Sequence, residues 1–179
     1  MVATKLVTVD EFAAMPLEGA WELVDGEMIE LSPTAGESGW ISAVMIGLLT
    51  MHVHQSGLGW VFSNETGFIL FDDRQTVRAP DAAVVLRTRL AKPPRSFVAM
   101  APDLAVEVLS PSDRMADAMS KIAMYLQAGV RLVWLIDPPS QTVTAFRLDE
   151  PPTKLGVGDT LDGGDVLPGF SVPVADIFA

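Results

Sequence analysis

The sequence predicts a mixed α/β or α+β domain, and three observations predict it. Two stretches, residues 40–55 and 113–128, carry apolar side chains at helical spacing. Several short apolar runs are bounded by glycine, proline or aspartate, as strands usually are. Strand and helix signals alternate along the chain, an order typical of helices packed on a sheet. At 179 residues, we expect one domain over residues 1–179.

In chain order, the first elements are a short helix and a hairpin. Thr8 stands three residues before Glu11, which is the spacing of a capping box at a helix start. Asp25-Gly26 separates two short runs and predicts a two-residue turn between strands. The helix over 40–55 comes next and ends at glycines. Four later runs are predicted to be strands: 60–71, 76–86, 103–109 and 130–137.

The second long helix connects two of these strands. Residues 113–128 lie between the strands over 103–109 and 130–137, which we expect to be parallel neighbours joined by a right-handed crossover. The run 142–148 then pairs with the preceding strand, and a terminal hairpin follows. The face of the helix expected to pack on the sheet is apolar: Met115, Ala118, Met119, Ile122 and Leu126.

Composition limits the class of protein. Apolar residues make up 49% and charged residues 20%, as in folded globular proteins. No apolar run reaches about 18 residues, so we expect no membrane span, and the first residues lack the pattern of a signal peptide. The absence of cysteine excludes disulfides and thiolate metal sites and fits a cytoplasmic location. The net charge of −11 is opposite to the basic surface typical of nucleic-acid binders.

Two carboxylates stand in otherwise apolar strands. Strand alternation places Glu107 on one face with Asp103, while the apolar residues between them take the other, packed face. If the strands over 76–86 and 103–109 are neighbours, Asp81 and Glu107 converge, and two carboxylates at a strand end suit Mg²⁺ or Mn²⁺. The alternative for either acid is a salt bridge or a solvated edge position.

Lys121 is a third candidate. It shares a stripe of the 113–128 helix with Arg114, Ala118 and Tyr125, beside the expected buried face. From that border an ammonium group can reach toward the carboxylates of the sheet. The alternative is an ordinary surface lysine.

Half of the basic residues fall within a short segment. Six of the twelve lie between positions 74 and 95: Arg74, Arg78, Arg87, Arg89, Lys92 and Arg95. Together they could form a locally positive face on an acidic protein. They could equally belong to a solvated, arginine-rich loop.

Other common chemistries lack support in this sequence. His52 and His54 are the only histidines, and their spacing points them to opposite sides of a helix, so we expect one packed and one solvated. There is no Gly-x-Ser-x-Gly motif of a serine hydrolase, no phosphate-binding loop and no dinucleotide fingerprint.

Five blocks of sequence lie in order along nearly the whole chain: WELVDGEMIELSP, TVRAPDAAVVL, APDLAVEVLSPSD, KIAMYLQAGVRLVWLIDP and GDVLPGFSVPVADIF. Together they resemble the Uma-two family of bacterial restriction-endonuclease-like proteins, within the PD-(D/E)XK nuclease superfamily. The resemblance implies a restriction-endonuclease-like mixed β-sheet flanked by helices, with added N- and C-terminal hairpins.

The resemblance also implies roles for particular residues. Asp81 corresponds to the acid of the Pro-Asp motif and Glu107 to the following acid, and both would hold a divalent metal ion. The superfamily lysine usually lies two residues after that acid, where this chain has Leu109. In this family the lysine lies on the next helix, which corresponds to Lys121. Glu37, at the start of the first core helix, corresponds to a glutamate that completes some of these sites.

Two positions depart from the family pattern. Ser38 stands where family members often carry a histidine. Asp103 also follows a proline but lies only four residues before Glu107, so we interpret it as a decoy for the motif acid or as a group supporting the site.

The functional hypothesis is a metal-dependent endonuclease that hydrolyses DNA phosphodiester bonds with Mg²⁺ or Mn²⁺. A non-catalytic relative that acts as a binding or regulatory module is the alternative. A glycosidase with two carboxylates is a third class, and it would need neither metal nor lysine. A homodimer is expected, because nucleases that cut both strands of a duplex often pair through two-fold symmetry.

Overall fold

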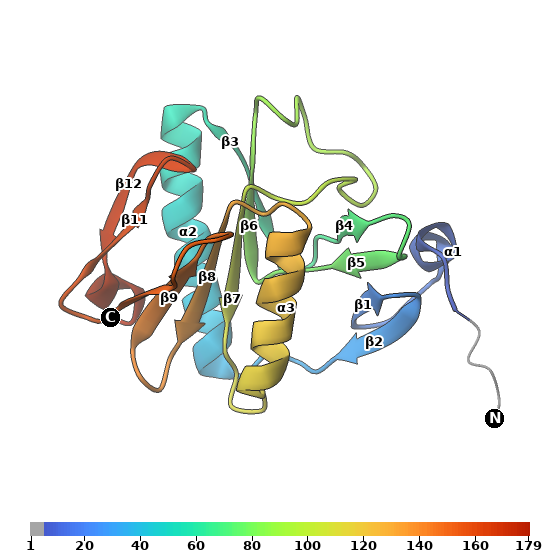
Figure 1. Cartoon of the computed structure of the whole chain (residues 1–179), viewed down its shortest axis with the longest axis horizontal. Helices are drawn as coiled ribbons and strands as arrows, with labels where there is room; N and C mark the ends of the chain where they lie inside the picture. Colours follow the sequence, from blue (N-terminus) through green and yellow to red (C-terminus); the bar gives the residue numbers. More distant parts are fainter. Residues whose placement is uncertain (1–5) are drawn as a thin grey trace.

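The computed structural model describes residues 6–179 and shows a central sheet between two helices, with a smaller sheet at one side (Figure 1). The helices are α1 (Val9–Ala14), α2 (Gly36–Ser56), α3 (Met115–Gln127) and the 3₁₀ helix η1 (Val174–Ile177). The strands are β1 (Ala20–Val24), β2 (Glu27–Leu31), β3 (Gly59–Ser63), β4 (Phe68–Phe71), β5 (Thr76–Arg78), β6 (Ala82–Leu86), β7 (Leu104–Val108), β8 (Leu132–Asp137), β9 (Thr142–Phe146), β10 (Thr153–Leu155), β11 (Thr160–Gly163) and β12 (Leu167–Pro173).

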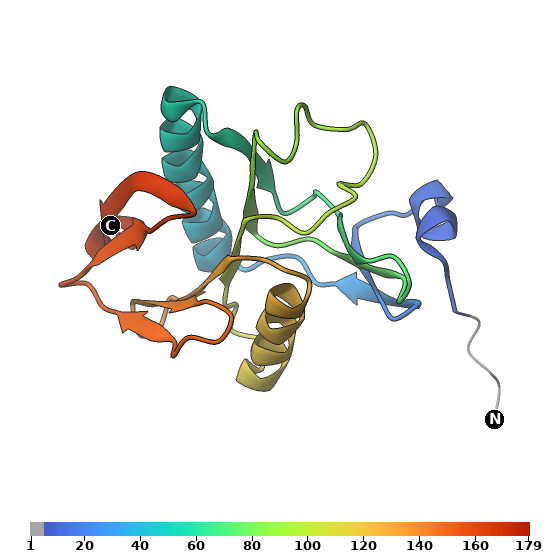
Figure 2. The same cartoon turned by 45° about the horizontal axis from the view of Figure 1, so that its top comes forward.

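The central sheet has six strands in the order β10-β9-β8-β7-β6-β3. β7 and β8 are parallel and are connected through α3, as the sequence predicts, while the other neighbours are antiparallel. α2 and α3 lie on opposite sides of this sheet (Figure 2). β6 and β7 are therefore interior strands, each with a strand on both sides.

Both faces of β7 are packed, whereas we expected one packed face. Val106 and Trp134 point to the side of α2, and Ala105 and Val133 point to the side of α3. All four are fully buried. A second covering helix explains why the strand is continuously apolar. Any charged group on β7 must therefore find partners within the fold.

The expected strands over 60–71 and 76–86 are each two strands. The first becomes β3 and β4, and the second becomes β5 and β6. β3 and β6 pair with each other in the central sheet, while β4 and β5 join β1 and β2 in a four-stranded sheet, in the order β2-β1-β5-β4. Pro80 separates β5 from β6, because proline cannot donate a ladder hydrogen bond. The N-terminal hairpin is thus part of a larger sheet.

The predicted caps and turns of the N-terminal region are confirmed. The Thr8 side chain accepts a hydrogen bond from the Glu11 amide, and the Glu11 side chain accepts one from the Thr8 amide. Asp25 and Gly26 have φ angles of 49° and 81°, and positive φ at both residues is what a two-residue type I′ turn requires. The C-terminal hairpin of β11 and β12 is confirmed as well.

Both long helices differ in detail from the prediction. α2 begins at Gly36, four residues before the expected start, and its first turn buries Ser38. On α3, Met115 and Met119 are 51% and 40% exposed, so the expected apolar face is wrong at these two positions. Ile122 is buried, as predicted, and Tyr125 is buried although it was not part of the predicted face. The helix is rotated so that Tyr125 and Lys121 reach the polar end of β7.

The histidines behave as expected. His52 packs edge-on against Phe170 at a centroid distance of 5.5 Å, whereas His54 is exposed. Within residues 6–179, none of the helices combines the length and the apolar character needed to cross a membrane.

Candidate functional site

Strand pairing brings the two predicted acids together. β6 and β7 are antiparallel with Ala82 opposite Val106, so Asp81, just before β6, lies beside Glu107 near the end of β7. The Asp81 Oδ2 atom accepts a hydrogen bond of 2.7 Å from the Val108 amide. The convergence of Asp81 and Glu107 expected from the sequence is therefore present.

α3 supplies two partners for Glu107. Lys121 Nζ lies 3.0 Å from Glu107 Oε2, and the Tyr125 hydroxyl donates to Glu107 Oε1 at 2.6 Å. Lys121 and Tyr125 are four residues apart, which places them on the same face of the helix. Both oxygens of Glu107 are thus hydrogen-bonded, and Lys121 is not an ordinary surface lysine.

Glu22, on β1, is a third acid that the sequence analysis missed. It is 1% exposed, and its carboxylate accepts two hydrogen bonds and forms an ion pair with Lys121. Lys121 Nζ lies 3.3 Å from Oε1, the Ala79 amide donates to Oε1 at 2.9 Å, and Arg78 Nη1 lies 2.6 Å from Oε2. Its sequence signal was the same as that of Glu107, namely a lone acid between apolar residues of a strand.

A pocket of about 510 Å³ lies between α3 and the β1–β2 hairpin, and its lining includes Glu22, Arg78, Glu107 and Lys121. Glu107 and Lys121 side chains are 13% and 18% exposed, so they are largely buried yet open to the pocket. Asp113, in the turn before α3, and Asp117, in the first turn of α3, line the same pocket. A ligand in this pocket can therefore contact both Glu107 and Lys121.

The two predicted acids are both shifted toward the protonated form. Burial raises the pKa of Glu107 to about 7; Lys121 and the Tyr125 hydrogen bond oppose this shift, whereas Asp81 and Glu22 add to it. Burial also raises the pKa of Asp81, against the lowering effect of the Val108 amide. The two neighbouring carboxylates are thus short of positive charge.

The pKa values of the remaining groups favour a charged Glu22, a charged Lys121 and a neutral Tyr125. For Glu22 the burial penalty is outweighed by Lys121 and Arg78, which lower its pKa. Burial alone would lower the pKa of Lys121, but Glu107 and Glu22 raise it above its usual value. Burial and Glu107 raise the pKa of Tyr125, so its hydroxyl remains a donor. Lys121 is accordingly a permanent cation at neutral pH.

The donor set fits a hard divalent cation at Asp81 and Glu107. Within residues 6–179, no group of three or more histidine, cysteine, aspartate or glutamate side chains is arranged to hold a metal ion. Mg²⁺, however, is commonly bound through one or two carboxylates, with water and substrate phosphate completing its shell. Two adjacent carboxylates with raised pKa values meet that requirement, because an added cation would supply the missing positive charge.

Two other sequence candidates lie apart from this group. Glu37 is exposed on the first turn of α2 and is not among the residues that line the pocket. Ser38 is buried beside it and donates to the Ala35 carbonyl. Asp103 lies at the opposite end of β7, paired with Arg89 and Arg131. This position agrees with the interpretation of Asp103 as a decoy, which stays a prediction, whereas the alternative of a supporting contact with Glu107 is wrong.

The six basic residues between positions 74 and 95 do not form one face. Arg78 lies in the site, whereas Arg74 pairs with Asp25 at 3.0 Å on the hairpin turn. Arg87 stacks on Trp60 at 4.5 Å, and Arg89 pairs with Asp103. Arg87 and Arg89 follow the end of β6 that is remote from Asp81. The positive charge that faces the pocket comes from α3 and β5.

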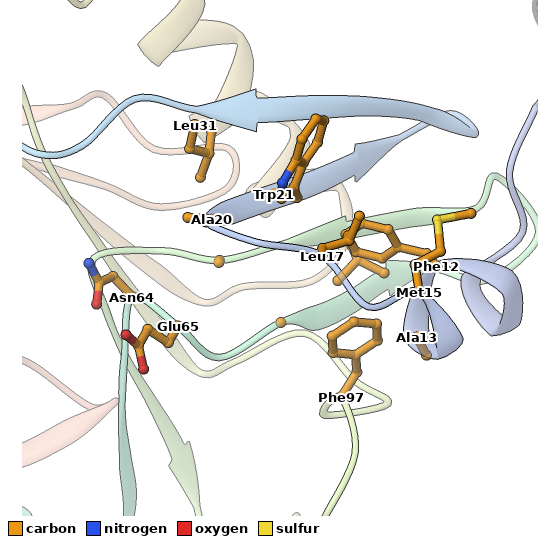
Figure 3. Close-up of a pocket in the computed structure, with 14 residues that line it drawn as sticks. Phe12, Ala13, Met15, Leu17, Ala20, Trp21, Leu31, Asn64, Glu65 and Phe97 are labelled. Carbon is orange, nitrogen blue, oxygen red and sulfur yellow. The ribbon is translucent and has the colours of Figure 1, made fainter.

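A larger pocket of about 620 Å³ lies behind the four-stranded sheet (Figure 3). Phe12, Trp21 and Phe97 line it, together with Leu31 at the end of β2. Strand alternation explains the separation: Trp21 faces α1, whereas its neighbour Glu22 faces Lys121. None of the acids around Lys121 lines this pocket, so the smaller pocket is the candidate site.

Comparison with solved structures supports the fold. The chain superposes with a TM-score of 0.81 on a crystal structure described as a putative nuclease belonging to DUF820, from Anabaena variabilis ATCC 29413. The two share 23% sequence identity, and the match covers 96% of this chain and 97% of the other. A search of curated proteins gives no match.

The mixed sheet flanked by helices, with its added hairpins, is a restriction-endonuclease-like fold, as expected from the sequence. A family model described as "Uma2: Putative restriction endonuclease" matches residues 9–175. The chain belongs to the Uma2 family, the Uma-two family that its sequence blocks resemble.

Proposed function

We propose that this protein is a divalent-metal-dependent endonuclease that hydrolyses phosphodiester bonds of DNA. The observation that carries the proposal is the convergence of Asp81, Glu107 and Lys121 at one end of the β6–β7 pair. Membership of a family described as restriction endonucleases supports the same reaction class. Asp81 and Glu107 would hold Mg²⁺ or Mn²⁺, which when bound polarises the phosphodiester.

The side chains of this site have distinct tasks in hydrolysis. The reaction joins the oxygen of water to phosphorus, breaks the bond from phosphorus to a sugar oxygen, and leaves a proton on the departing sugar oxygen. Lys121 stays protonated, so it can orient the attacking water or stabilise the negative charge that develops on the phosphate. Tyr125 holds Glu107 by its second oxygen and so fixes the direction of that carboxylate.

The test is cleavage of supercoiled plasmid by purified protein with Mg²⁺ or Mn²⁺. We expect nicking that EDTA stops and that Glu107→Gln abolishes, because the variant loses a metal-binding carboxylate. Asp73→Asn is the matched control, since it removes an exposed carboxylate in a turn away from the pocket. Glu37→Gln in the same assay tests the separate role implied for that residue by the family resemblance.

A non-catalytic relative is the alternative outcome. It is favoured if no metal gives cleavage and calorimetry detects no Mn²⁺ binding that depends on Glu107. The DNA substrate, a homodimer and a cytoplasmic location stay predictions. Size-exclusion chromatography with light scattering tests the homodimer, and parallel assays on plasmid and on RNA test the substrate.

A further inference from the structure

We propose that Arg78 binds the substrate phosphate and that Glu22 positions Arg78 and Lys121 as a pair of cations for that phosphate. The inference rests on the proposed function, since it names the group in the same pocket that recognises a phosphodiester. It assigns a binding role to Arg78 and a positioning role to Glu22, two residues that the sequence analysis did not place in the site.

The geometry places both cations on one carboxylate. Glu22 Oε2 lies 2.6 Å from Arg78 Nη1, and Glu22 Oε1 lies 3.3 Å from Lys121 Nζ. The Ala79 amide, next to Arg78 in the chain, also donates to Oε1 at 2.9 Å. With two hydrogen bonds and an ion pair on its two oxygens, Glu22 fixes the position of Arg78 relative to Lys121.

Arg78 retains donor capacity beyond its bond to Glu22. A guanidinium has five N–H donors, and its fork matches the oxygens of a phosphate. The Nε atom of Arg78 is buried and has no hydrogen-bond partner among residues 6–179. The Arg78 side chain is 12% exposed and lines the pocket together with Glu107 and Lys121. Because Nε is closed to solvent, the donors that a ligand could reach are those of the terminal Nη1 and Nη2 groups, of which Nη1 already donates to Glu22. A phosphate in the pocket would bind Arg78 through these terminal nitrogens.

The side chains around the pocket carry more negative than positive charge, so a phosphate can bind there only with cations close to it. The acidic side chains that line or border it are Glu22, Asp81, Glu107, Asp113 and Asp117, and the basic ones are Arg78, Lys121 and Arg114. Five acids against three bases repel a polyanion. Fixed cations at short range, with a divalent ion on Asp81 and Glu107, offset that repulsion at the phosphate itself.

The paired residue Arg74 offers a matched control. Arg74 is also an arginine bound to an acid of the β1–β2 hairpin, since its Nε lies 3.0 Å from Asp25 Oδ1. It is 42% exposed and lies outside the pocket. Any effect of losing an arginine–carboxylate pair at this sheet should appear at both positions, whereas phosphate binding should depend on Arg78 alone.

The direct test is proton–nitrogen NMR of the arginine Nε–H groups in the intact, wild-type protein. The Arg78 signal is identified by its absence in Arg78→Lys. On titration with the dinucleotide TpT, with and without Mg²⁺, we expect the Arg78 signal to move and the Arg74 signal to stay. An unmoved Arg78 signal at saturating TpT overturns the proposal, and so does a response to inorganic phosphate without one to TpT.

Activity gives a second measurement. We expect Arg78→Gln to lower the rate of plasmid cleavage about 10²- to 10³-fold, the usual loss for one preorganised donor, with Arg78→Lys in between. Glu22→Gln should act in the same direction. Mn²⁺ affinity, measured by calorimetry, should change less than about threefold in the Arg78 variants, because neither Asp81 nor Glu107 is altered. Arg74→Gln should cleave like the wild type.

The outcomes separate this inference from the proposed function. Wild-type cleavage that Arg78→Gln leaves unchanged contradicts the inference while the nuclease proposal stands. No cleavage by the wild type contradicts the nuclease proposal, and the NMR titration then still decides whether Arg78 binds a phosphodiester. Circular dichroism tests whether each variant is folded. The NMR titration uses the wild-type protein, and a variant is needed only to assign the Arg78 signal.

Discussion

The two ends of the β6–β7 pair have the same Pro-Asp dipeptide and the same kind of amide hydrogen bond, but different side chains surround them. Each strand is preceded by Pro-Asp: Pro80-Asp81 before β6 and Pro102-Asp103 before β7. Because the strands are antiparallel, the two aspartates lie at opposite ends of the pair. Each accepts an amide hydrogen bond from the end of the other strand, Asp81 from Val108 at 2.7 Å and Asp103 from Leu86 at 2.9 Å.

The neighbours of the two aspartates are opposite in charge. Arg89 Nη1 lies 3.1 Å from Asp103 Oδ2, and Arg131 Nη1 lies 3.9 Å from Oδ1, so Asp103 has two cations near it. Asp81 instead has Glu107 beside it, and Lys121 is shared between Glu107 and Glu22. The same dipeptide therefore binds cations of the fold at one end and lies beside a carboxylate with a raised pKa at the other, the corner at which we propose the site.

The largest expected effect is on cleavage. Asp81→Asn keeps the shape of the side chain but removes the charge that would hold a metal ion, so we expect plasmid cleavage to fall by about 10³-fold or more. Asp103→Asn, the same change at the other corner, should leave cleavage per folded molecule within about threefold. Equal losses in both variants would contradict the division of roles.

The second effect is on stability and runs in the opposite order. Asp103→Ala removes the acceptor of the Leu86 amide and the carboxylate partner of Arg89, while Arg131 keeps its ion pair with Asp165. We expect it to lower the free energy of unfolding by about 3 kcal/mol. Asp81→Ala should cost less, because it also relieves the repulsion of Glu107. Urea denaturation in EDTA measures both, and a larger loss for Asp81→Ala would contradict the expectation.

Much of this arrangement could be predicted from the sequence, and the limits have physical causes. Their place in apolar strands identified Asp81 and Glu107, the stripe on the 113–128 helix pointed to Lys121, and the resemblance to the family implied a role for each. The neighbours of Asp103 could not be predicted, because Arg89 and Arg131 reach it through the fold from positions 14 residues before it and 28 after it. Sequence spacing says nothing about such long-range pairs.

Glu22 and Arg78 were missed for a related reason. β5 and β6 were predicted as one strand over 76–86, and Arg78 was grouped with the basic residues between positions 74 and 95 rather than with β1. Only the pairing of β5 with β1 in the separate sheet brings Arg78 to Glu22. The face of α3 was misjudged similarly: Met115 and Met119 are the more apolar choice, but the hydrogen-bonding needs of Glu107 turn Tyr125 inward.

The third effect is a pH dependence that belongs to the Glu107 corner. A carboxyl whose pKa rises from 4.5 to about 7 on folding binds more protons in the folded state than in the unfolded state between these pH values. Stability must therefore fall as pH increases through that range, by about 2–3 kcal/mol in metal-free protein. Lys121 does not contribute in this window, since it stays protonated in both states.

Thermal unfolding in EDTA from pH 4.5 to 8 measures this dependence. Glu107→Gln should remove the fall, and Asp103→Asn should retain it. Saturating Mg²⁺ should also reduce the fall in the wild type, because a bound cation favours the ionised carboxylate. A stability that increases steadily through this range in EDTA would contradict the raised pKa of Glu107.

The smallest effect separates the direction of Glu107 from its charge. Tyr125→Phe removes one hydrogen bond of 2.6 Å from Glu107 Oε1 and leaves the Lys121 contact in place. Partners that orient a metal-binding side chain usually contribute 10- to 100-fold in affinity, and we expect a loss of about tenfold in Mn²⁺ affinity by calorimetry. Trp60→Phe is the control, because it removes the indole hydrogen bond to the Leu90 carbonyl, in the loop after the remote end of β6. Unchanged Mn²⁺ affinity in Tyr125→Phe would mean that Lys121 alone fixes Glu107, and that the inward turn of Tyr125 serves packing against the sheet.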